Sequence, residues 1–165
     1  MPLLETMIEV AKPWAKFYSK SHVAQGVIMF AHIGGMLWGG GLAVSADRSV
    51  WKLRRAGAEE RARLLAEIDR LHVPVVVGLI IASLSGVLLF VADLETYGTS
   101  FLFWGKMAAF ALLLVNGRWL QVQEQRMQKA SGLIAGRWGA LTIASWASMT
   151  LWFVVALGGV LLKNA

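Results

Sequence analysis

Two ionisable side chains lie within long apolar stretches of the chain, where a charge is costly. His32 falls in Ser21–Ala46, which contains no Asp, Glu, Lys or Arg, and Lys106 interrupts the apolar stretch Thr96–Gly117. Ionisable residues inside such stretches face a protein interior or a ligand, because lipid tolerates them poorly. An imidazole can ligate a metal, and an ammonium can pair with an anion. His32 and Lys106 are therefore the first candidates for catalysis and binding.

The helix face that carries His32 is unusually smooth. Gly35, Met36 and Gly39 follow His32 at helical spacing, and Met29 precedes it by one turn. A flat macrocycle can lie against this face with His32 as the axial ligand of its iron. Alternatively, Gly35 and Gly39 form a seam of small residues for close helix packing, with His32 hydrogen-bonded across it. The sequence leaves both interpretations open.

Lys106 also allows two interpretations. Its side chain can extend towards Asp93 and Glu95 at the membrane surface. Otherwise it reaches a propionate, an iron or a porphyrin from the side opposite His32. Asn116 lies roughly 80° around the same helix, where it either borders the same cavity or bonds to a neighbouring helix.

The other two histidines do not complete a bis-histidine haem site. His22 shares a helix with His32, so the two imidazoles cannot sandwich one iron. His72 lies at the opposite membrane boundary, about 20 Å from His32 by helical rise. The open ligand sets are therefore His32 alone, His32 with Lys106, or His32 with a methionine.

Four apolar stretches must position these side chains. The chain has 165 residues, of which 57% are apolar and only 16% are charged, whereas soluble domains carry about 25% charged residues. Spans are predicted at about 21–46, 71–92, 98–120 and 138–162, each long enough to cross a bilayer. Short connections make sequential spans antiparallel. The predicted fold is an all-α integral membrane protein, an up-down bundle of four transmembrane helices over residues 21–165.

Residues 1–20 predict an amphipathic helix on the membrane surface, bent at Pro13. Leu4, Ile8, Ala11 and Trp14 recur at helical spacing, opposite a charged face. A membrane anchor is the simpler interpretation of this pattern, and a docking surface for a partner is the alternative.

The net charge of +6 marks orientation rather than a nucleic-acid partner. Basic residues gather in 47–70 and 118–137, so the positive-inside rule places these loops in the cytoplasm and both termini outside, in the inner membrane of a bacterium. The residues 58–70 and 118–129 are expected to extend their spans as helices, with a turn at Ser131–Gly132. The absence of cysteine excludes disulfides and thiolate metal sites.

A known layout matches these residues. The first span has His32, then Trp38-Gly39-Gly40-Gly41-Leu42 and Arg48; a charged approach, Glu60–Arg70, precedes Pro74; and Lys106 lies in the third span. This layout resembles the small four-helix membrane proteins that include HemJ-type protoporphyrinogen oxidase and CopD-like copper-resistance domains. In the HemJ-type family the first-span histidine and the third-span lysine are the functional pair. The spacing from His32 to Trp38 is one residue shorter here, and Asn116 stands where that family tends to have histidine.

The resemblance implies haem b, a redox role, and a porphyrin or quinone-type substrate. His32 is the expected axial ligand, and Lys106 is the expected second ligand or propionate partner. The residues expected around the cofactor are Gly35, Met36, Trp38, Gly39 and Asn116. Two alternatives remain. The first is a CopD-like copper site, since Met29, His32 and Met36 suit Cu(I). The second is an accessory subunit of a larger membrane complex or a homo-oligomer, embedded in the lipid bilayer without a cofactor.

Overall fold

The computed structural model describes residues 2–53, 55–129 and 138–164, and these residues form helices joined by short connections. No strand occurs in the described part of the chain, which confirms the predicted all-α class. The helices, in chain order, are α1 (Pro2–Lys20), α2 (His22–Leu53), α3 (Ala58–Ala92), α4 (Leu94–Thr99), α5 (Phe101–Lys129) and α6 (Trp138–Asn164).

Three of these helices are long and apolar enough to cross a membrane: α2, α3 and residues 139–162 of α6. The prediction of a helical membrane protein is confirmed to this extent. The helix α5 has 29 residues, but its mean hydropathy is lower, because its second half is rich in polar side chains. The structure therefore supports three spans by composition, where the sequence predicts four.

The helices run well past the predicted span boundaries. The helix α2 continues through Asp47 to Leu53, and α3 begins at Ala58, so most of the expected loop 47–70 is helical. The predicted helical extensions 58–70 and 118–129 are confirmed. The expected turn at Ser131–Gly132 lies outside the described residues. We call the end where α2 stops and α3 starts the loop end, and the opposite end the α1 end.

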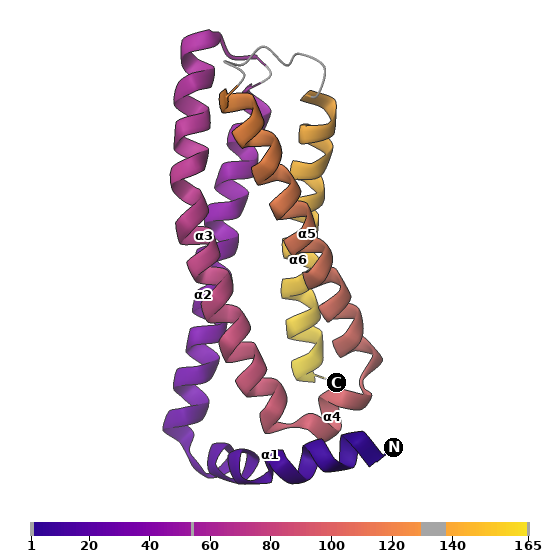
Figure 1. Ribbon diagram of the computed structural model, residues 1–165. Helices are drawn as coiled ribbons and strands as arrows, with labels where there is room; N and C mark the ends of the chain where they lie inside the picture. Colours follow the sequence, from indigo (N-terminus) through magenta and orange to yellow (C-terminus); the bar gives the residue numbers. More distant parts are fainter. Residues whose placement is uncertain (1, 54, 130–137, 165) are drawn as a thin grey trace.

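Two helix pairs make the bundle. The helix α3 packs along α2, α5 packs along α6, and α2 also contacts α6 (Figure 1). The main cluster of buried apolar side chains lies at the loop end. Its members are Val50, Leu53, Leu65, Ile68, Leu120, Met127, Leu141 and Ala144. Trp51 stacks on Trp146 beside this cluster, with ring centroids 4.4 Å apart. At the α1 end, Phe90 of α3 stacks on Phe103 of α5 at 4.7 Å.

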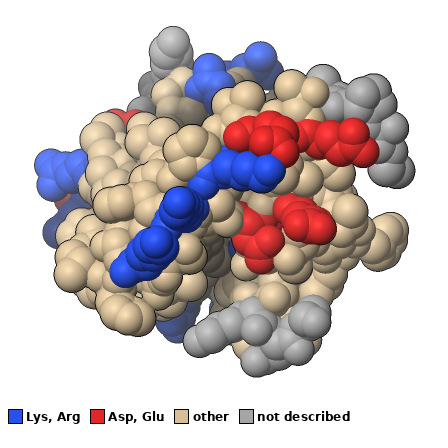
Figure 2. Space-filling model, turned by 90° about the horizontal axis from the view of Figure 1, so that it is seen from below, with Lys and Arg blue, Asp and Glu red and all other residues tan. Residues whose placement is uncertain are grey.

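The helix α1 lies across the end of the bundle (Figure 1), as an amphipathic helix should. Ala11 is buried against the bundle, and Trp14 Nε1 donates a hydrogen bond to the Leu88 carbonyl of α3 at 3.0 Å. Seen from this end, a band of basic side chains crosses the face beside acidic ones (Figure 2). Met7, Val10 and Phe17 remain exposed. The helix α1 thus packs one apolar side against the bundle and has a second, exposed apolar strip that can contact lipid.

Candidate functional site

The imidazole of His32 is anchored to α3. His32 Nδ1 donates to the Ala82 carbonyl at 2.8 Å, and Ser85 Oγ lies 3.3 Å from the same nitrogen. A carbonyl oxygen only accepts hydrogen bonds, so the ring proton is on Nδ1 and the Nε2 lone pair is left free. Histidines that bind metals are commonly held in this way, because the bond fixes the tautomer and the ring orientation.

The glycines that follow His32 lie in the interface between α2 and α3. A Cβ added at Gly35 would lie 2.8 Å from the Gly78 carbonyl oxygen, and one added at Gly39 would lie 3.2 Å from the Val75 carbonyl oxygen. Both glycines are buried. The helix-packing interpretation of this seam therefore describes the structure, and α3 covers the surface on which a macrocycle was expected to lie. His32 fits an axial ligand, whereas Gly35 and Gly39 do not fit a support for the ring plane.

Lys106 lies along α6. A Cβ added at Gly158 would lie 3.3 Å from Lys106 Cβ, and one added at Gly159 would lie 3.4 Å from Lys106 Nζ. No carboxylate of the described residues is within ion-pair distance of Lys106, so the expected extension to Asp93 or Glu95 is not made. The Lys106 ammonium instead interacts electrostatically with the His32 ring. The two candidates thus belong to different helix pairs, His32 to α2/α3 and Lys106 to α5/α6.

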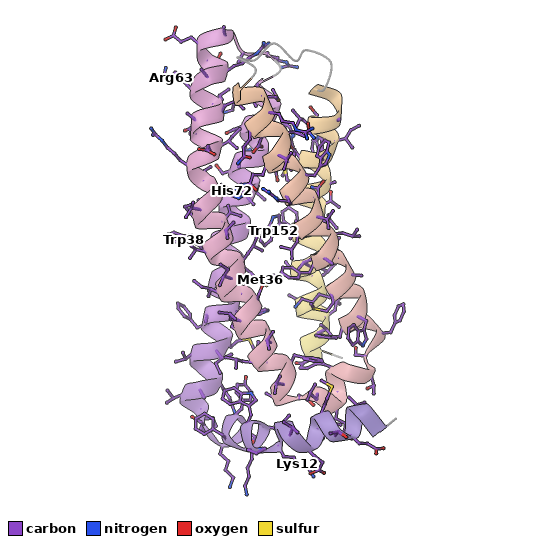
Figure 3. All side chains as sticks on the ribbon, viewed as in Figure 1. Lys12, Met36, Trp38, Arg63, His72 and Trp152 are labelled. Carbon is purple, nitrogen blue, oxygen red and sulfur yellow. The ribbon has the colours of Figure 1, made fainter. Side chains whose placement is uncertain are left out.

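The remaining predicted cofactor residues do not gather at His32. Trp38 is 62% exposed and lies on the outside of α2 (Figure 3). Met36 is half-buried and lies below Trp152 in the same view. Asn116 Nδ2 donates to the Ala144 carbonyl of α6 at 2.9 Å, so it joins α5 to α6. Of these residues, only Met36 lies on the same side of α2 as His32, one helical turn away. Met36 is therefore the one that could join His32 in a site.

A second polar centre lies between all four long helices near the loop end. We call it the loop-end chamber, a half-open cavity of about 260 Å³. Its polar lining residues are Asp47, His72, Arg118, Gln121, Glu124 and Ser148, and its other walls are mainly leucine, valine and Trp152. In Figure 3, His72 lies above Trp152 at this level. His22, by contrast, is exposed at the start of α2.

Asp47 is the residue that sequence reasoning missed. It was assigned to a loop, because the apolar stretch of the first span ends just before it. In the structure Asp47 is 5% exposed, and the Ser145 and Ser148 hydroxyls of α6 lie beside its carboxyl group. Asp47 follows Gly40 by two helical turns, so it continues the face that packs on Trp152. This spacing is the signal that could have identified it.

Glu124 faces the same chamber from α5. It lies about 34 Å along α5 from Phe101 at 1.5 Å per residue, beyond a hydrocarbon core of roughly 30 Å. Burial, together with the nearby carboxyls of Asp47 and Asp69, raises the pKa of Glu124 to about 8. A carboxyl with this pKa changes its charge close to neutral pH, so the chamber can take up or release a proton there.

Comparison with known proteins gives no match: no family model, no curated protein and no solved structure matches this chain. The relation to HemJ-type and CopD-like proteins therefore stays a prediction from the residues. Among the described residues, no three His, Cys, Asp or Glu side chains meet as a metal-binding group. Any metal at His32 would therefore take its other ligands from a macrocycle, a thioether or an amine.

Proposed function

We propose that this chain is an integral membrane protein that binds haem or a related porphyrin through His32 Nε2, in a redox role. The hydrogen bond from His32 Nδ1 to the Ala82 carbonyl carries the proposal. It presents a neutral imidazole whose second nitrogen is free, which is the state that a haem iron requires. Bound haem supplies electron transfer at its iron.

Such a ring would lie between the two helix pairs, because His32 is carried by α2 and Lys106 by α5. His32 would hold the iron, and Lys106, which packs against Gly158 and Gly159 of α6, would hold a propionate or supply a second ligand. Gly35 and Gly39 are covered by α3 and take no part in the proposed site.

Four spans are part of the same proposal. Residues 101–117 of α5 contain one charged side chain, Lys106, and α5 packs along α6. With α5 as the third span, the connection between α2 and α3 and the end of α5 lie on one side. The basic residues there assign that side to the cytoplasm of a bacterial inner membrane, with both termini outside.

Absorption spectroscopy of the purified protein tests haem binding. We expect a Soret band after haem supplementation, its loss in His32→Ala, and its retention in His22→Ala, since His22 is exposed on the same helix. Lys106→Met should keep part of the band and shift the reduction potential, because a cation near haem favours the reduced state. A protein that stays colourless with added haem contradicts the proposal and favours an accessory subunit.

A further inference from the structure

The buried carboxyl group of Asp47 lines the loop-end chamber. Asp47 is 5% exposed, and its Oδ2 has no hydrogen-bond partner among the described residues. A buried polar atom without a partner costs free energy, so such an atom calls for an explanation. The Ser145 and Ser148 hydroxyls approach the carboxyl group from α6, and Ser145 Oγ also lacks a hydrogen-bond partner among the described residues. The wall of the chamber therefore contains a buried, ionisable carboxyl group.

The buried part of the chamber is acidic. Glu124 faces it from α5, and the charges of Asp47 and Asp69 act on Glu124. The positively charged lining residue, Arg118, is exposed and donates to Gln121 Oε1 at 2.6 Å. From α3, His72 is influenced by both Asp69 and Arg118. An occupant that carries positive charge and N–H donors complements this arrangement best.

The rest of the lining is apolar, which decides between a metal ion and an organic cation. The chamber has about 260 Å³, far more than one ion fills. No group of three His, Cys, Asp or Glu side chains in the described residues surrounds a metal position. Trp152, 8% exposed, lines the wall and can attract a cation to its ring. Apolar walls with a few polar groups are typical of sites for small organic ligands.

We propose that the loop-end chamber binds a small organic ammonium ion, with the Asp47 carboxylate accepting a hydrogen bond from the ammonium group and Glu124 supplying a second negative charge. The apolar body of the ligand packs against the leucine and valine side chains and Trp152. This proposal does not depend on haem binding at His32.

Binding of the ammonium ion is coupled to proton release from Glu124. Because the pKa of Glu124 is raised to about 8, its carboxyl holds a proton at lower pH, and a bound cation favours the ionised form. The titratable and charged groups around it are Asp47 on α2, Asp69 and His72 on α3, and Arg118 on α5. Burial also raises the pKa of Asp47 to about 7, so affinity increases as pH rises through about 7 and about 8, where the two carboxyls ionise, and levels off above that range.

Calorimetric titration with 2-phenylethylammonium in nanodiscs tests the site. At about pH 8.5 we expect the wild-type protein to bind the probe, and Asp47→Asn to weaken binding at least about tenfold. Glu67→Gln, an exposed carboxylate on α3 that does not line the chamber, is the matched control and should bind as the wild type does. His32→Ala should also bind normally, which separates this site from the proposed haem site.

The uncharged analogue 2-phenylethanol gives a control that needs no variant. It has the same shape without the positive charge, and we expect no measurable binding. Equal affinity for 2-phenylethanol, wild-type affinity in Asp47→Asn, or no binding of 2-phenylethylammonium to the wild type would each overturn the proposal. The same dependence of affinity on pH in Glu124→Gln as in the wild type would remove the part assigned to Glu124.

Discussion

Glu124 and Asp47 are the acidic side chains of the loop-end chamber, and neither stands out in the sequence, because each lies among other polar or charged residues. Both carboxyls belong to segments that resemble charged loops, and the helices that carry them extend beyond the apolar stretches. His32 and Lys106 could be selected from the sequence, because each is exceptional within an apolar stretch. Their partners could not, since the Ala82 carbonyl and the Gly158 surface come from helices that only the three-dimensional packing brings close.

Replacing Glu124 by glutamine should stabilise the protein in a pH-dependent way. The pKa of Glu124 is raised from its ordinary value of 4.5 to about 8, so the folded protein holds a proton that the unfolded chain loses between these values. Stability contributed by this group is therefore lost as pH rises from 4.5 to about 8. At about pH 9, Glu124→Gln should raise the free energy of unfolding by on the order of 2 kcal/mol.

Thermal unfolding of both proteins at about pH 5 and about pH 9 checks this expectation. The two should differ little at the lower pH, where Glu124 is already neutral in the folded state. A gain of equal size at both values would show that burial of the charge is not the cause.

The pair of helices α2 and α3 depends on the absence of side chains at its seam. A Cβ at Gly78 would lie 2.7 Å from the Gly39 Cα, so the two backbones touch where a methyl group would have to fit. The spacing of Gly35 and Gly39 predicts such a seam on one helix. Gly78 and Ala82 have the same spacing on α3. The sequence does not show which small residue of α2 faces which small residue of α3, because this register depends on how the two helices pack.

Gly78→Ala should therefore separate the helices and lower the stability of the bundle by about 1–3 kcal/mol, the range of overpacked cores. Gly34→Ala is the matched control, because nothing lies within 4 Å of a Cβ at that position. It should be neutral or stabilising by up to about 1 kcal/mol, since alanine favours a helix over glycine. Denaturant unfolding in detergent measures both changes, and equal losses in the two variants would contradict the seam.

Across the whole molecule, side chains are layered by depth. The buried apolar side chains and the chamber lie at the loop end. His32 and Lys106 lie at the next level along the bundle, and α1 crosses the opposite end. The all-helical class is predicted from hydropathy and periodicity, and the structure confirms it; a helix, α1, is present where the amphipathic first helix is predicted. The extensions of α3 and α5 are predicted as well, whereas the continuation of α2 to Leu53 is not, because hydropathy assigns this polar sequence to a loop.

The crossing of α5 can be tested by labelling, because the chain has no native cysteine. Lys16→Cys and Glu95→Cys should react with a membrane-impermeant maleimide from outside intact cells. Gly57→Cys and Gln125→Cys should react only after the inner membrane is opened. All four positions are exposed. Reaction of Gln125→Cys from outside, together with Glu95→Cys, would mean that α5 does not cross and that the chain has three spans.

The hydrogen bond between Trp14 and Leu88 joins residues 74 positions apart, and this distance sets an order of events during synthesis. When α1 leaves the ribosome, the backbone on which it docks has not been made. The contact therefore cannot form until α2 and α3 have both been synthesised. Docking of α1 thus follows the formation of α3, although α1 is the first helix to be made.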